Sequence, residues 1–322
     1  MQRNLIIQNL YKKIFFVARD GYLPNKVYNI LNNGKYIPSE YIYGSRVAYW
    51  TGTYSSIYDL LTQQKNSFQS DYTLEDFINA YISDKQVQFY LKNKYTQTEL
   101  KTGIKYNFET SYELLKREHE IFDTYYKNQK QLAEEYYANV FYNENERIVV
   151  FDVGYSGSVS RGLSKLTPKI VDKIYIHETT KNIYRDNKYQ TCTFVLKNGI
   201  ESNLYGNLDL LLEECFSPLE GTCCGFKRDA NKIVPILDAM NIGTKMKEIH
   251  TQLNKATETF AKDLATLFGE YVEYLNITDI NPIFKCIDSN FKNNPNEKEI
   301  FKDIVFNDTA VMHNQKPLSK KI

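Results

Sequence analysis

The segment VVFDVGYSGSVSRGL, residues 149–163, constrains the fold more than any other part of the chain. Residues 147–151 form a β-branched, apolar run of the kind found in a strand that is buried on both faces. The run stops at Asp152, a glycine- and serine-rich turn follows, and a helical pattern then continues to about Leu166. A strand that leads through a short polar turn into a helix is typical of parallel sheets whose strands alternate with helices.

The amino-terminal part of the chain shows the same alternation. Residues 14–18 are apolar and end on Arg-Asp-Gly (residues 19–21), and apolar residues then recur at helical spacing over residues 23–31. A second apolar and aromatic run, residues 41–43, ends on Gly-Ser-Arg (residues 44–46). This order of strand, helix and strand predicts a βαβ unit.

The alternation stops over residues 50–145, which we interpret as a helical insertion. Thr73 is a suitable helix cap, and Asp76 follows it at the spacing of a capping box. Apolar residues gather on one side of residues 111–141, as expected of helices that pack on a core.

Further strands are predicted at residues 173–177 and 191–196, with an edge strand at 233–237, where Pro235 is incompatible with a central position. Residues 246–275 form one long amphipathic helix, whose apolar side we expect to pack on the core. The predicted fold is α/β, with an open and mainly parallel sheet of the phosphoribosyltransferase-like or another doubly wound type. The predicted domains are an α/β domain over residues 1–238, with the helical insertion at about 50–145, and a C-terminal helical region over residues 239–322.

Composition excludes several classes of function. The 40 basic and 39 acidic residues nearly cancel, so no long-range field would attract nucleic acid or an acidic membrane. No apolar run is long enough for a membrane span, and no cleavage site of a signal peptide is present. The five cysteines are odd in number and lack a C-x-x-C pair, which predicts reduced thiols, no zinc site and a cytoplasmic location.

The turn that follows Asp152 is the strongest candidate binding site. Backbone N–H groups and the positive end of a helix dipole meet there, which favours a bound anion such as phosphate. The predicted contacts come from Gly154, Tyr155, Ser156, Gly157 and Ser158. The alternative is a tight turn with a capped helix and no ligand. The segment is not a P-loop, because no lysine follows its second glycine, and Gly154 stands where the haloacid-dehalogenase motif Asp-x-Asp needs its second acid.

Side chains at the other strand ends extend this candidate site, because the carboxyl ends of parallel strands share one edge of a sheet. Arg19 and Arg46 are forked donors for phosphate or carboxylate, and we expect Gly21 and Ser45 to contact the same ligand. The candidate catalytic residues are the two acids Asp20 and Asp152. They are suited to hold sugar hydroxyls, to act as a general base or to bind a metal such as Mg²⁺, although the sequence identifies neither a metal nor a cofactor. The alternative for Arg19 and Asp20 is a structural ion pair.

In architecture, the chain resembles the type I phosphoribosyltransferases. Their D-V-x-T-T-G loop is similar to residues 152–157, although Phe151 stands where that family has the first of two acids. Residues 19–21 occupy the place of the short loop that binds pyrophosphate in those enzymes.

A closer resemblance is to a bacterial family of haloacid-dehalogenase-like predicted hydrolases. Its ordered motifs F-L-A-R-D-G-Y, Y-x-x-S-R-R and D-I-G-W-x-G-S are similar to residues 15–22, 43–46 and 152–158, and an acidic helix with a glycine turn is similar to residues 212–221. The acids of that helix, Glu213 and Glu214, are additional candidates. The resemblance implies a role in capsule or lipopolysaccharide biosynthesis beside glycosyltransferases. In that family the region usually follows a separate haloacid-dehalogenase domain.

Two functional hypotheses follow. The first is an enzyme of bacterial surface-polysaccharide biosynthesis that acts on a phosphorylated sugar or nucleotide-sugar, as a transferase or a hydrolase. The alternative is a non-catalytic module that senses a ligand or partners a glycosyltransferase or hydrolase. In that case the C-terminal helix would serve as a docking face or as the seam of a homo-oligomer.

Overall fold

The structure is a computed structural model, and its central element is a five-stranded sheet in which every strand is parallel to its neighbours. The residues it describes are 10–54, 56–64, 71–155, 157–179, 191–197, 215–238, 244–269, 271, 305–306 and 316–317. The strands are β1 (Ile14–Val17), β2 (Ser39–Ile42), β3 (Arg147–Tyr155), β4 (Ile170–Thr179) and β5 (Thr191–Lys197), in the order β2-β1-β3-β4-β5. The predicted α/β class with an open parallel sheet is therefore confirmed.

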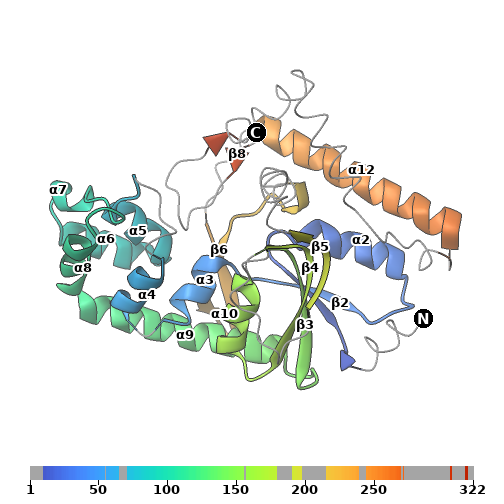
Figure 1. The fold of residues 1–322 in the computed structure, drawn as a ribbon, viewed down its shortest axis with the longest axis horizontal. Helices are drawn as coiled ribbons and strands as arrows, with labels where there is room; N and C mark the ends of the chain where they lie inside the picture. Colours follow the sequence, from blue (N-terminus) through green and yellow to red (C-terminus); the bar gives the residue numbers. More distant parts are fainter. Residues whose placement is uncertain are drawn as a thin grey trace.

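The direction of the strand order reverses between β1 and β3. The chain leaves β1 through α2 (Tyr22–Asn32) to β2, whereas it leaves β3 through α10 (Ser158–Leu166) to β4 on the other side. These two helices cover opposite faces of the sheet (Figure 1). In open α/β sheets such a reversal leaves a crevice at the carboxyl ends of the two strands, where ligands commonly bind.

Alternating side chains of β1 enter two different cores, as the period of a strand requires. Phe15 and Val17 pack toward α9 (His119–Val140) and α10, whereas Phe16 packs toward α2 with Tyr28 and Phe151. Both faces of the sheet are thus apolar, which explains why the strands are continuous apolar runs rather than alternating ones.

The helical insertion has a core of its own. Its helices are α3 (Arg46–Thr51), α4 (Ile57–Gln64), α5 (Leu74–Tyr81), α6 (Lys85–Asn93), α7 (Gln97–Leu100), α8 (Phe108–Lys116) and α9. Helices α4 to α8 form a separate group in Figure 1, and α9 runs from this group along the sheet. Fully buried aromatic side chains such as Tyr72, Phe77 and Phe122 fill the space between them.

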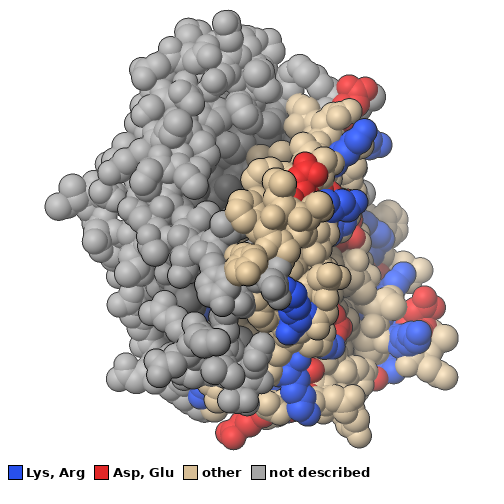
Figure 2. Space-filling view, turned by 90° about the vertical axis from the view of Figure 1, so that its right-hand side faces the viewer, with Lys and Arg blue, Asp and Glu red and all other residues tan. Residues whose placement is uncertain are grey.

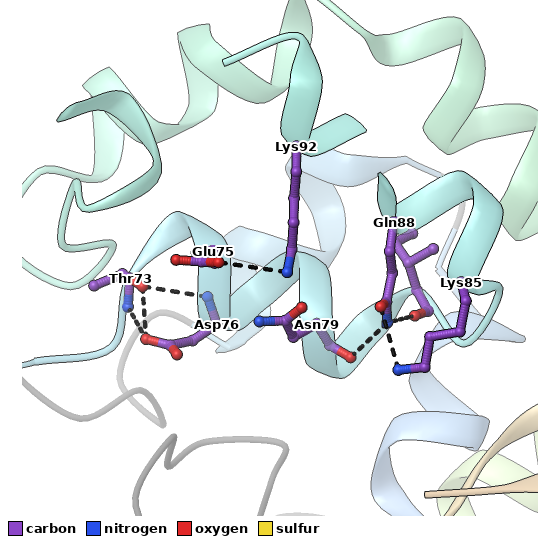
Figure 3. Close-up of polar contacts among 8 residues, drawn as sticks. Thr73, Glu75, Asp76, Asn79, Lys85, Gln88 and Lys92 are labelled. Atoms are coloured by element: carbon purple, nitrogen blue, oxygen red, sulfur yellow. Dashed lines mark hydrogen bonds and ion pairs between the residues drawn. The ribbon is translucent and has the colours of Figure 1, made fainter. Parts of the chain in front are cut away.

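Polar contacts specific to the sequence set the ends of these helices (Figure 3). The predicted cap at Thr73 is confirmed, because its backbone N–H donates to Asp76 at 2.9 Å and its hydroxyl accepts from the Asp76 N–H at 3.2 Å. The side chain of Gln88 donates to the carbonyl of Asn79 at 3.0 Å, which ties α6 to α5. Such caps stabilise a helix by about 1 kcal/mol each.

A two-stranded antiparallel hairpin, β6 (Cys223–Asp229) and β7 (Lys232–Leu237), lies apart from the sheet. A strand does form at the predicted residues 233–237, but the prediction that it lies at the edge of the main sheet is wrong. The side-chain amide of Gln129 on α9 accepts from the N–H of Phe226 at 2.9 Å and donates to its carbonyl at 3.1 Å. Gln129 of the insertion thus forms hydrogen bonds with the backbone of the hairpin, as a neighbouring strand would in a larger sheet.

Helix α12 (Thr244–Phe268) packs along α2 on the outer side of the sheet (Figure 1). The predicted helix is present but ends at Phe268 and not at residue 275. The prediction that its apolar side packs on the core is wrong at several positions: Phe260 and Leu267 are 64% and 77% exposed, and Ala256 is exposed as well. The buried positions include His250 and Ala261 instead. The reason is that α12 meets α2 through polar contacts such as the 2.9 Å pair of Lys26 and Glu258.

The remaining described strands, β8 (Val305–Phe306) and β9 (Lys316–Pro317), pair with each other in an antiparallel ladder. Among the described residues, no helix combines the length and the apolar character that crossing a bilayer requires. Lys and Arg side chains are interspersed with Asp and Glu over the described part of the face in Figure 2, in agreement with the balanced net charge.

Candidate functional site

The strand that leads into the candidate anion turn is longer than predicted. β3 continues to Tyr155, because Gly154 pairs with His177 and Tyr155 with Glu178 on the equally long β4. The prediction that the strand ends at Phe151 and the loop begins at Asp152 is therefore wrong. Only residues 156 and 157 separate β3 from α10, and Ser156 lies outside the described residues.

The start of α10 still presents backbone donors to this turn. Gly157 is its N-cap residue and has φ 81°, a left-handed conformation that glycine adopts without strain. The helix then begins at Ser158, so the N–H groups of its first turn have no acceptor within the helix itself. Of Tyr155, only the backbone is described.

The neighbouring strand β1 ends in a tight turn, which its register with β3 places level with Asp152. The Ala18 N–H donates to the carbonyl of Ile42 at 2.8 Å, and the Gly21 N–H donates to the carbonyl of Val17 at 2.8 Å. A Cβ atom at Gly21 would lie 2.6 Å from the Val17 oxygen, so no larger residue fits this turn. The peptide bond between Ala18 and Arg19 is cis.

Arg19 and Asp20 lie on this turn and face different neighbours. Nη1 of Arg19 is enclosed by the protein. Burial lowers the pKa of His250 on α12, and the positive charge of Arg19 lowers it further, which places the guanidinium close to that ring. Burial raises the pKa of Tyr41, and the charges of Glu220 and Asp20 add to this rise, which places Asp20 beside β2.

Ser45 and Arg46 begin α3. The Ser45 hydroxyl accepts from the Ala48 N–H at 3.1 Å and donates to the carbonyl of Cys223, so it caps the helix and joins the hairpin to it. The guanidinium of Arg46 lies 5.7 Å from the centre of the Trp50 ring, a cation–π contact at the border of the insertion. Both Ser45 and Arg46 therefore form contacts within the fold itself.

Asp152 is buried within β3. Phe16 of β1 is in register with Phe151, so Asp152 lies where β1 ends. Alternation along β3 places it on the face of Val150, toward α3. Burial raises the pKa of Tyr49 on α3, and the charge of Asp152 raises it further, which shows that the two groups are close.

Two residues of this region were not among the predicted site residues. Glu220 accepts hydrogen bonds from the hydroxyls of Tyr41 at 3.0 Å and Tyr43 at 3.2 Å. The rings of Tyr22, Tyr41 and Tyr43 follow one another at 5.8 and 5.5 Å. Glu220 belongs to the acidic motif of residues 212–221, but the candidates predicted from that motif were Glu213 and Glu214, which lie outside the described residues.

His250 is the second residue that sequence reasoning missed. It is 4% exposed and belongs to the face of α12 that packs on α2. A histidine within a polar helical segment carries no sequence signal for such burial. Only the position of α12 over α2 brings it close to Arg19.

The thiols and carboxylates determine which reactions and which metal ions are compatible with the carboxyl edge of the sheet. Burial raises the pKa of the Cys224 thiol to about 12, so it is protonated and unreactive at neutral pH. In the described part of the chain, no three His, Cys, Asp or Glu side chains gather as a metal-binding group. Mg²⁺ commonly takes one or two carboxylates together with substrate phosphates, and Asp20 and Asp152 are residues of that type.

No protein-family model matches the chain, and no curated protein sequence matches it significantly.

Proposed function

We propose that the chain binds a phosphorylated sugar or nucleotide-sugar at the carboxyl ends of β1 and β3, and acts on it as a transferase or hydrolase. The observation that carries this proposal is the strand order β2-β1-β3-β4-β5. It puts the Arg19–Asp20 turn and the turn before α10 at adjacent strand ends, on both sides of the reversal. Crevices at this position are the usual ligand sites of open α/β sheets.

The residues at this edge suit a ligand that combines phosphate with hydroxyl groups. The first-turn N–H groups of α10 and the guanidinium of Arg19 are donors for phosphate oxygens. The carboxylates of Asp20 and Asp152 would accept hydrogen bonds from sugar hydroxyls, serve as a general base or hold Mg²⁺ against the phosphate. Assignment to bacterial surface-polysaccharide biosynthesis rests on the sequence resemblance alone.

Ligand-induced stabilisation tests the proposal. The protein is heated with inorganic phosphate, glucose 1-phosphate, UDP-glucose or phosphoribosyl pyrophosphate, each with and without Mg²⁺, and with glucose as the unphosphorylated control. A ligand at 100 times its dissociation constant should stabilise the fold by about 2.7 kcal/mol. The proposal is wrong if none of the phosphorylated compounds stabilises a well-folded sample.

The exposed side of α12 favours a second candidate, a non-catalytic module that partners a glycosyltransferase or hydrolase or forms a homo-oligomer. Phe260, Leu267 and Tyr271 are exposed on or just after this helix, and large exposed apolar groups that lie together often mark protein contacts. The double variant Phe260→Ser and Leu267→Ser should then change the sedimentation behaviour or the capture of a purified glycosyltransferase. Asp152→Asn should leave both unchanged. The reverse pattern would support the enzyme.

A further inference from the structure

His250 lies at a contact between α12 and the strand-end turn of β1. Helix α12 packs on α2, and the 2.9 Å ion pair of Lys26 with Glu258 joins the two helices. The turn that carries Arg19 leads directly into α2. The His250 side chain is therefore buried where the outer helix passes the proposed site, rather than in either apolar core.

The imidazole ring uses only one of its two nitrogens within the described part of the protein. Nδ1 is buried there without a hydrogen-bond partner among the described residues. A contact with the backbone of Ser217 opposes the lowering of the His250 pKa, and because Nδ1 has no described partner we assign this contact to Nε2. If Nε2 donates to the Ser217 carbonyl, the neutral ring has its lone pair on Nδ1, and Nδ1 is an acceptor.

A second acceptor lies one helical turn away. The Asn254 side-chain N–H donates to the carbonyl of His250 at 2.8 Å, which fixes the orientation of the amide. Its Oδ1 atom is buried and likewise lacks a partner among the described residues. Buried polar atoms without partners are rare in native proteins, and two on neighbouring residues require an explanation.

The two acceptors need a group that donates hydrogen bonds. A phosphate does not meet this need, because its oxygens are acceptors, whereas a sugar hydroxyl does. The turn that carries Arg19 leads into α2, on which α12 packs, and the charge of Arg19 contributes to the lowered pKa of His250, so a cation for the phosphate and acceptors for a hydroxyl belong to the same region. This arrangement is complementary to a molecule that has both a phosphate and a hydroxyl group.

We propose that His250 and Asn254 bind hydroxyl groups of the sugar whose phosphate lies at Arg19 and the start of α10. The inference rests on the proposed function and deepens it, because it makes α12 part of the ligand site. It also gives the buried polar atoms of His250 and Asn254 a hydrogen-bonding role.

Isothermal titration of variants tests this inference. The wild type, His250→Phe and Asn254→Leu are titrated with inorganic phosphate, glucose 1-phosphate, ribose 5-phosphate and UDP-glucose. Loss of one hydrogen bond should weaken the binding of the sugar-bearing probes about tenfold, while phosphate affinity stays within about twofold. The matched control is His119→Phe, since His119 is exposed on α9 and should leave every affinity unchanged.

The outcomes separate this inference from the proposed function. If the wild type binds sugar phosphates and both variants bind them equally well, the inference fails and the proposed function stands. An equal loss for phosphate and sugar phosphates also overturns it, because the residues then support only the fold. If the wild type binds none of the probes, both proposals fall. A crystal structure of the bound protein in which only water contacts Nδ1 and Oδ1 would contradict the inference even if the His250 variant failed to fold.

Discussion

At the amino ends of the strands, both oxygens of a buried carboxylate have hydrogen-bond partners, whereas near the carboxyl ends some buried polar atoms have none among the described residues. Asp172 on β4 is 1% exposed, and its oxygens accept from Arg147 at 2.6 and 2.9 Å and from the Tyr11 hydroxyl at 2.8 Å. Burial raises the pKa of Tyr11, and its hydrogen bond to Asp172 raises it further, so this hydroxyl remains a donor.

Near the opposite edge, Nδ1 of His250 and Oδ1 of Asn254 are buried polar atoms that form no hydrogen bond with a described residue. The comparison shows that two kinds of buried polar group lie near opposite edges of the sheet. A network with a partner for every atom fixes the structure, whereas open acceptors beside strand-end turns indicate a place for a ligand. Substitutions at the two edges test this difference.

The largest effect is expected from Asp172→Ala. This change leaves the partly buried Arg147 and the Tyr11 hydroxyl without their common acceptor, and removing one partner of a buried ion pair typically costs about 3–5 kcal/mol. Urea unfolding measures the loss. The control Glu135→Ala breaks the exposed pair with Arg228 and should change the free energy of unfolding far less. Equal effects of the two variants would contradict a special role for the buried network.

Arg19→Leu should affect binding more than stability. A hydrogen bond to a charged group contributes about 1.5–3 kcal/mol, so the affinity for inorganic phosphate should fall by roughly 10- to 100-fold. The loss in free energy of unfolding should be smaller than for Asp172→Ala. Titration calorimetry and urea unfolding measure the two quantities, with Arg228→Leu on the hairpin as the control. If Arg19→Leu destabilises the protein strongly without changing affinity, Arg19 belongs to a structural pair.

A smaller effect is expected where Glu220 joins β2. Tyr41→Phe removes one hydrogen bond between the end of β2 and the segment before β6, and Glu220→Ala removes this bond together with the one from Tyr43. A double-mutant cycle should give a coupling energy of about 1 kcal/mol between these two positions. A coupling energy near zero in urea unfolding would mean that the contact contributes nothing to the stability of this edge.

The smallest effect is a pH dependence due to His250. Burial lowers its pKa in the folded protein, so below the usual pKa near 6.5 the unfolded chain binds more protons at this residue. Its contribution to the free energy of unfolding is complete above pH 6.5 and is lost as the pH falls toward the lowered folded-state pKa. His250→Phe should flatten this part of the stability curve, whereas His119→Phe should not. An unchanged slope below pH 6.5 in His250→Phe would show that the ring is equally easy to protonate in both states.

The local elements were largely predictable from the sequence, because each depends on neighbouring residues. The capping box at Thr73, the strand at residues 14–17 and the helix that follows each follow from spacing and capping chemistry. The extension of β3 to Tyr155 was not predictable, because its hydrogen-bond partners are on β4. The same reason applies to the hairpin β6–β7, whose strand β6 we did not predict and whose backbone pairs with Gln129.

The site was predictable only in part, for a related reason. Arg19 and Asp20 follow a strand directly, and the end of a parallel strand is a general location for ligand residues. Glu220 and His250 come from segments about 200 residues later in the sequence, and no local pattern indicates that they reach the end of β1 or β2.

By itself, the sequence determined the α/β class, the helical insertion and the residues at the ends of its strands, because periodicity and turn chemistry act between near neighbours. The tertiary structure decided the strand order, the side chains that come together at each edge, and the face of α12 that is buried. These depend on contacts between distant segments, and their free energy appears only when β1 lies beside β3 and α12 lies on α2.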